Sequence, residues 1–156
     1  GEKITLRRSD YLGSSQAINF SYTHSALKQN IGKLGVLLCI ETSKKREEIA
    51  DLGKKLAMQI ASLSPLAIDK EDLDQNILKK EKEIIIEELK NSGKDTKIVE
   101  KIAMGKVNKF INDNTLLNQE WIMEPKKKVS DVIKEVVGKD KMKIKKFVRY
   151  KVGEGL

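Results

Sequence analysis

Two side chains in this chain, Cys39 and His24, are of types that act as nucleophile or general base in enzymes. A catalytic thiol needs a neighbouring base or cation that lowers its pKa, and a catalytic histidine needs an orienting carboxylate and a nucleophile. Cys39 instead stands inside the apolar run 37–40, and His24 ends the alternating stretch 16–24. We interpret Cys39 as a buried, inert thiol and His24 as a structural or contact residue.

Three further segments have partial signatures of phosphate, dinucleotide or calcium sites. A phosphate-binding loop needs a glycine five positions before Gly93 and a Ser or Thr after the lysine, but Glu88 and Asp95 occupy these positions. Residues 153–155 are too short for a dinucleotide fingerprint, and the acidic segment 69–74 lacks the central glycine of a calcium loop. One histidine and one cysteine cannot supply a Cys/His zinc site. We expect no catalytic residue, no cofactor and no metal ion.

Positive charge is the strongest compositional signal. The 156 residues carry a formal net charge of +8, which favours an acidic partner such as nucleic acid. Residues 139–151 hold seven basic side chains and one acidic one. As a strand they would present Lys145, Arg149 and Lys151 on one face, with Phe147 available to stack on a base. RNA binding by this strand is one hypothesis. The alternative is a solvated edge-strand face whose lysines oppose aggregation.

Length and composition limit the class of protein further. A chain of this length fits one domain with a substantial core, and 4% aromatic residues require a core of aliphatic side chains. No run of about 18 apolar residues is present, so we expect no membrane span. The first residues lack the pattern of a signal peptide, and a single cysteine fits a reducing compartment. We expect the cytoplasm as the location.

Alternation of apolar and polar residues predicts extended segments at 2–12, 16–24 and 144–152, and the apolar run 33–41 predicts a central strand. We expect turns at 13–15 and 28–32. In the last strand one face is predicted to carry Ile144, Lys146, Val148, Tyr150 and Val152. This strand must pair with the early strands, because nothing nearer in the chain is extended.

Spacings of three and four residues predict helices in the middle of the chain. A helix over 49–63 follows the candidate N-cap Ser43, and a helix capped by Asp69 extends to about residue 91. After a break at residues 92–93, a third helix is predicted from about residue 95. Two long helices joined by a short link predict an antiparallel hairpin. A short helix at 131–137 follows Ser130 and ends at Gly138.

We therefore predict the α+β class, a small antiparallel sheet packed with helices and interrupted by an inserted antiparallel helical hairpin. The core subdomain is predicted at 1–64 and 117–156, and the hairpin at 65–116. The hydrophobic core of the core subdomain is expected to contain Ile4, Leu6, Val36, Leu38, Leu56, Ile60, Val148 and Val152.

Six motifs in one order along the chain together resemble the C-terminal half of bacterial translation elongation factor Ts. The first three are Gly1-Glu2-Lys3-Ile4 with Arg7-Arg8, Tyr22-x-His24 followed by 32–37, and Leu56-Ala57-Met58-Gln59-Ile60-Ala61 before Pro65. The last three are the 97–110 helix, the links 116–119 and 125–127, and the Phe-Val-Arg-Tyr-Lys-Val-Gly-Glu-Gly strand at 147–155. Gln59 stands where the family often has His, and Lys151 where Glu is common.

The resemblance implies a guanine-nucleotide exchange factor in protein synthesis, and not an enzyme that makes or breaks covalent bonds. It implies that the partner is elongation factor Tu carrying GDP. It implies that Tyr22 and His24, with Gly32 and Gly35 nearby, contact this partner away from the nucleotide. In the family, GDP release depends largely on an N-terminal helical domain and a Thr-Asp-Phe-Val motif, and this chain has no Asp-Phe pair. We therefore expect weak binding to elongation factor Tu and little exchange activity from these residues alone.

The resemblance also implies that the hairpin is similar to the family's coiled-coil or dimerisation element. Its apolar residues occupy more than one helix face, which leads to the hypothesis of a homodimer through Ile77, Ile84, Ile98 and Ile102. Elongation factor Tu is the first expected partner and a second copy of the chain is the next. Nucleic acid is expected only under the RNA-binding alternative.

Overall fold

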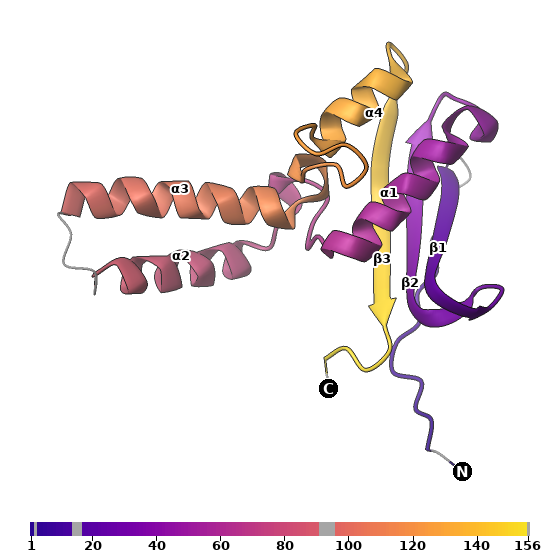
Figure 1. Cartoon of the computed structure of the whole chain (residues 1–156), viewed down its shortest axis with the longest axis horizontal. Coiled ribbons are helices and arrows are strands. Elements are labelled where there is room, and N and C mark those ends of the chain that lie inside the picture. Colours follow the sequence, from indigo (N-terminus) through magenta and orange to yellow (C-terminus); the bar gives the residue numbers. More distant parts are fainter. Residues whose placement is uncertain (2, 14–16, 91–95, 156) are drawn as a thin grey trace. The chain divides into compact units, whose positions relative to one another are not determined.

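The computed structural model describes residues 1, 3–13, 17–90 and 96–155 (Figure 1). Its strands are β1 (Ala17–Lys28), β2 (Ile31–Thr42) and β3 (Met142–Lys151). Its helices are η1 (Arg46–Ile49), α1 (Ala50–Leu63), η2 (Lys70–Asp72), α2 (Gln75–Lys90), α3 (Thr96–Asn114), η3 (Leu116–Asn118) and α4 (Val129–Val137). The α+β class is confirmed. The predicted turn at Ser14-Ser15 and the break at 92–93 lie outside the described residues.

Tertiary contacts divide the chain into two compact units, residues 1–61 with 137–156 and residues 62–136. The first unit therefore joins segments from both ends of the sequence, and the second contains α2 and α3. The narrower assignment of a core subdomain and a 65–116 insertion stays a prediction.

The sheet of the first unit is antiparallel and has the order β1-β2-β3. Phe20 lies opposite Leu38 and Tyr22 opposite Val36, so the alternation predicted for β1 is confirmed. Leu37 lies opposite Val148 in β3, which confirms that the last strand pairs with an early one. The hairpin turn is shorter than predicted, because β1 continues to Lys28 and β2 begins at Ile31.

Helix α1 covers one face of this sheet (Figure 1). Gly53 lies against the Phe20 ring so closely that a Cβ at position 53 would overlap the ring. The Nε of Arg149 in β3 donates to the carbonyl oxygen of Ala61 at 3.4 Å. The predicted core residues Val36, Leu38, Leu56 and Ile60 are all buried. The face that carries Phe20 and Arg149 is called the helix face below, and the opposite one the open face.

A β-bulge in β3 overturns the predicted alternation of that strand. Ile144 lies opposite Ile40, but Cys39 lies opposite Lys146, so Lys145 is one extra residue. Because side chains alternate with a period of two, this insertion exchanges the two faces for the rest of the strand. Val148 therefore lies on the open face and is half-buried, and Val152 beyond the strand is 75% exposed, so neither belongs to the core.

The N-terminal segment is also different from the prediction. Its described residues form no strand, and Ile4 and Leu6 are 90% and 85% exposed, so they are not core residues. The segment is held by side-chain contacts and not by the backbone hydrogen bonds of a strand. One of these contacts is from the Arg7 guanidinium, which donates to the carbonyl oxygen of Glu154 at 2.8 Å. Both sides of the central strand β2 are already occupied by β1 and β3, so a further strand cannot pair with it.

Three predicted helix starts are wrong in detail, and one of them is Ser130, which lies inside α4 and does not precede it. Ser43 lies before the helix start, and the Glu48 carboxylate accepts instead from the Lys45 backbone N–H at 2.8 Å. Asp69 caps the short η2, accepting from the Lys70 N–H at 2.8 Å, and α2 begins only at Gln75. The chain is extended at Leu73, whose side chain is 3% exposed, so burial of this residue interrupts the predicted helix.

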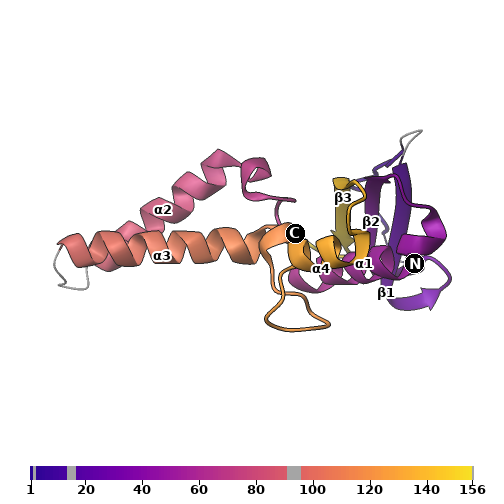
Figure 2. The same ribbon diagram turned by 90° about the horizontal axis from the view of Figure 1, so that it is seen from above.

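In the second unit α2 and α3 lie side by side in both views (Figures 1 and 2). Ile85 and Leu89 are the buried apolar residues of α2, and Lys106 of α3 pairs with Glu88 of α2 at 2.9 Å. Leu116 and Val129 are also fully buried. None of the helices in the described ranges is long and apolar enough to cross a membrane.

Two glycines of β2 provide a matched test of this sheet. A Cβ at Gly32 would lie 2.8 Å from the His24 carbonyl oxygen, whereas a Cβ at Gly35 would meet no atom within 4 Å. We expect Gly32→Ala to lower the free energy of unfolding by about 1–3 kcal/mol, because the hairpin backbone must shift. Gly35→Ala should leave it unchanged or slightly raised. Urea titrations of both variants measure this, and equal stability of the two would contradict the hairpin geometry.

Candidate partner-binding site

Tyr22 and His24, two of the residues implicated by the sequence, lie side by side on β1. The Tyr22 hydroxyl oxygen and His24 Nδ1 are 3.0 Å apart, and their ring centroids are 6.1 Å apart. Because they are two positions apart in one strand, both side chains leave the same face of the sheet. His24 is exposed and Tyr22 half-buried, so this pair offers a ring surface with a polar rim.

Gly32 determines how closely β2 approaches the backbone beside His24. The β1–β2 pairing is irregular between Ala26 and Lys28, and Ser25 has a φ of 52°. Only a residue without a Cβ fits opposite this irregular segment, because the His24 carbonyl oxygen occupies the space. Gly32 therefore acts on the candidate site through the backbone, which holds the imidazole at the hairpin end.

Gly35 is on the opposite, open face of the sheet. It lies opposite Thr23 in β1 and opposite Tyr150 in β3. A cavity of about 500 Å³ covers this position, and its lining includes Leu37, Gly35 and Tyr150 from the sheet and Arg8 and Asp10 from the N-terminal segment. Leu37 is 39% exposed there. The predicted set is thus divided between two faces: Tyr22 and His24 on one, Gly35 on the other.

Fixed charges border this open-face groove. The Tyr150 hydroxyl donates to Asp10 at 2.8 Å and Lys146 Nζ lies 3.1 Å from the same carboxylate. The hydrogen bond from Tyr150, followed by the one from Lys146, lowers the pKa of Asp10. The same bond raises the pKa of Tyr150. Asp10 is therefore ionised and Tyr150 neutral at physiological pH, which are the protonation states that both contacts require.

The sequence did not indicate that Arg8, Asp10 or Tyr150 belong to a site. The only signal was alternation in β3, which placed Tyr150 on the same face as Ile144. The bulge separates these two residues, so the groove is visible only after the register is known.

Three of the residues predicted for an RNA-binding face, Phe147, Arg149 and Lys151, do share one face of β3, but this is the helix face. Phe147 lies opposite Leu38 there and is half-buried, so its ring is only partly accessible for stacking on a base. Arg149 is also on that face and pairs with Glu154 at 2.7 Å. Lys145 pairs with Glu41 at 3.1 Å. Much of the cationic character of β3 is therefore neutralised within the first unit.

In the second unit, the four residues predicted for self-association stand on α2 and α3. Ile77, Ile84 and Ile98 are 39%, 52% and 52% exposed, and Ile102 is half-buried. Exposed isoleucines at several helical positions are consistent with an unpartnered apolar surface.

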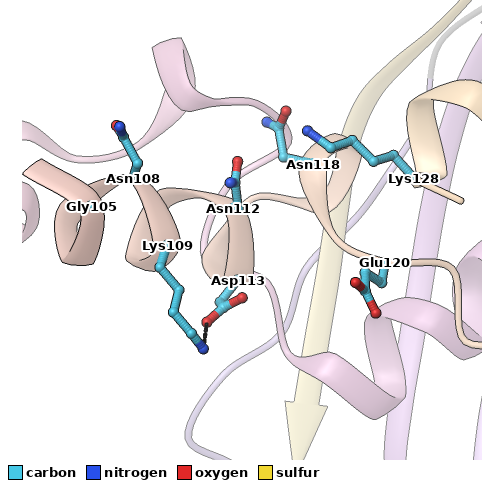
Figure 3. A pocket seen from close by; sticks show the side chains of 8 residues that line it. All are labelled: Gly105, Asn108, Lys109, Asn112, Asp113, Asn118, Glu120 and Lys128. Atoms are coloured by element: carbon cyan, nitrogen blue, oxygen red, sulfur yellow. Dashed lines mark ion pairs between the residues drawn. The ribbon is translucent and has the colours of Figure 1, made fainter. Parts of the chain in front are cut away.

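A second hollow, of about 360 Å³, lies beside the C-terminal half of α3 (Figure 3). Its lining is polar and of mixed charge: Gly105, Asn108, Lys109, Asn112, Asp113, Asn118, Glu120 and Lys128. Lys109 and Asp113 form an ion pair with one another at 3.3 Å. Across the described ranges, no group of three or more His, Cys, Asp or Glu side chains is placed to hold a metal ion.

Two residues singled out in the sequence, Cys39 and Gln59, are buried in the structure. Cys39 is a buried free thiol, as interpreted from its apolar run. Gln59, which replaces a common family histidine, is fully buried in α1. Its departure from the family pattern therefore lies in the interior, not at an exposed contact surface.

Known proteins place the chain in a family. The model of the Elongation factor TS family matches residues 1–154. Elongation factor Ts of Nitrobacter hamburgensis is 39% identical over 158 residues, and that of Rickettsia felis 38% identical over 160, each alignment covering all of this chain and 52% of the relative. The chain thus spans about half the length of the curated relatives that it matches. With a family match over nearly its whole length, the chain belongs to the elongation factor Ts family.

Proposed function

We propose that this chain binds elongation factor Tu and supports GDP release from it during protein synthesis in the cytoplasm. Family membership over residues 1–154 supports the translation role. The structural observation that supports binding is the contact of half-buried Tyr22 with exposed His24, in a hairpin whose backbone is constrained by Gly32. Binding, not bond chemistry, is the proposed activity.

Exchange by such a protein is a linkage effect. A factor accelerates net nucleotide release only if it binds the nucleotide-free partner more tightly than the nucleotide-bound partner. The surfaces described above can supply affinity for the partner. The Asp-Phe pair that the family resemblance associates with disturbing the nucleotide site is absent from these 156 residues. We therefore assign these residues to anchoring the partner and not to displacing its nucleotide.

The division between anchoring and displacement can be measured directly. We expect this chain to bind elongation factor Tu in a titration, and to leave the release rate of fluorescently labelled GDP close to the spontaneous rate. A full-length elongation factor Ts serves as the positive control in the same assay. Full acceleration by this chain would refute the assignment, and absence of binding at any concentration tested would refute the proposed function.

Substitutions can identify the binding face. We expect His24→Ala to weaken binding about 5- to 30-fold, since truncating an aromatic contact at an interface centre costs about 1–2 kcal/mol. Gly35→Val should also weaken binding, because it fills the groove over the open face without clashing with the sheet. Lys134→Ala on exposed α4 is the matched control and should bind normally. Normal affinity in both test variants would place the contact elsewhere.

We further propose that α2 and α3 mediate self-association, supported by the exposure of Ile77 and Ile84 on α2. Sedimentation velocity over a range of concentrations should show a monomer–dimer equilibrium. The double variant Ile77→Glu/Ile84→Glu should shift it to monomer, because two charges cannot be buried in an apolar interface without partners. Lys79→Glu, an exposed position on the opposite face of the same helix, is the control. A strict monomer for the unsubstituted chain would rule the proposal out.

A further inference from the structure

The segment 7–12 crosses the open face of the sheet and is attached at three places. Arg7 donates to the Glu154 carbonyl oxygen at 2.8 Å. Asp10 accepts from the Tyr150 hydroxyl at 2.8 Å and from Lys146 Nζ at 3.1 Å. The Leu12 carbonyl oxygen accepts from Asn19 Nδ2 at 2.7 Å. These contacts attach the segment to β3 on one side of the sheet and to β1 on the other.

Strand register places Cys39 beneath this segment. Asn19, Cys39 and Lys146 lie opposite one another on β1, β2 and β3 and therefore share the open face. The two outer residues of this row are the ones bound by Leu12 and Asp10, so residues 10–12 pass over the middle one. Burial agrees with this: Cys39 is 5% exposed, whereas its same-face neighbour Leu37 is 39% exposed.

Only weak forces hold the segment closed. Of its two apolar side chains, Tyr11 is 88% exposed and Leu12 is only half-buried, so the segment gains little from burial. The ion pair between Asp10 and Lys146 is partly exposed, and such pairs contribute little to stability. Asn19 Oδ1 is buried with no hydrogen-bond partner among the described residues, an arrangement that disfavours the closed state. Opening would return this oxygen to water.

We propose that residues 7–12 form a detachable strap over the open face, latched by the contacts of Asp10 with Tyr150 and Lys146. The Arg8 guanidinium, 4.6 Å from the Tyr150 ring centroid, adds a cation–π contact to the latch. Arg8 and Asp10 also line the groove beside Gly35. Release of the strap therefore removes one wall of the groove and uncovers the Cys39 thiol in the same movement.

The thiol itself reports on the strap, because this chain has a single cysteine. In the whole chain under native conditions, Cys39 should react slowly with Ellman's reagent, at a rate set by the open fraction. We expect Asp10→Asn and Tyr150→Phe each to increase this rate about fivefold, through a larger open population. Asp10→Asn keeps an acceptor oxygen but loses the negative charge that strengthens the contacts with Tyr150 and Lys146, and Tyr150→Phe removes one of these contacts altogether. Because the two substitutions act on the same hydrogen bond, the rate increase in the double variant should be smaller than the product of the two single increases. Asp113→Asn removes an exposed ion pair in the second unit and should leave the rate unchanged.

The dependence on urea separates strap opening from global unfolding. Local opening exposes little surface, so the rate should change only weakly with urea below the unfolding transition. A steep dependence would show that the thiol reacts only from the unfolded state and would overturn the proposal. Unchanged rates in both Asp10→Asn and Tyr150→Phe would overturn it as well. The assay needs no elongation factor Tu, so its outcome is independent of the proposed function.

Discussion

One extra residue in β3 determines what each surface of the first unit can do. The bulge at Lys145 changes the side-chain parity of the strand, so that Phe147 and Arg149 face α1 while Lys146 and Tyr150 face the opposite side. Without it, Lys146 and Tyr150 would both lie on the helix face, and Asp10 would lose both of its side-chain partners on β3. The attachment of the N-terminal segment, the groove beside Gly35 and the burial of Cys39 all depend on this local insertion.

The two faces of the sheet consequently have different physical characters. On the helix face, buried aliphatic side chains and close packing of Gly53 against Phe20 produce a rigid platform from which the hairpin extends to Tyr22 and His24. On the open face, exposed Leu37 and a segment held by side-chain contacts leave a surface that small energies can rearrange. The rigid surface is at Tyr22 and His24, and the adjustable one is the groove on the open face. Such a combination suits the proposed role of binding a partner that changes its nucleotide state.

The charge of +8 has a different meaning in the folded chain than in the sequence. Lys145, Lys146 and Arg149 each pair with a carboxylate from another segment of the first unit. Lys44 and Asp140 add a further pair at 2.9 Å, which raises the pKa of the lysine and lowers that of the aspartate. Three of the positive charges on β3 are thus paired within the first unit, and one of these pairs, Lys146 with Asp10, joins the N-terminal segment to the sheet. Less of the positive charge is therefore available to phosphate groups.

The sequence by itself determined the α+β class, the pairing of the last strand with an early one, the burial of Cys39 and the family. These follow from local periodicity and from motif order, which a single chain displays without knowledge of its folding. Tertiary structure alone decided the faces of β3, the exposure of Ile4 and Leu6, and the late start of α2. The reason is physical: strand register, the space left beside a sheet and the burial of Leu73 depend on contacts between distant segments, and a one-residue bulge has no signature in the alternation that it interrupts.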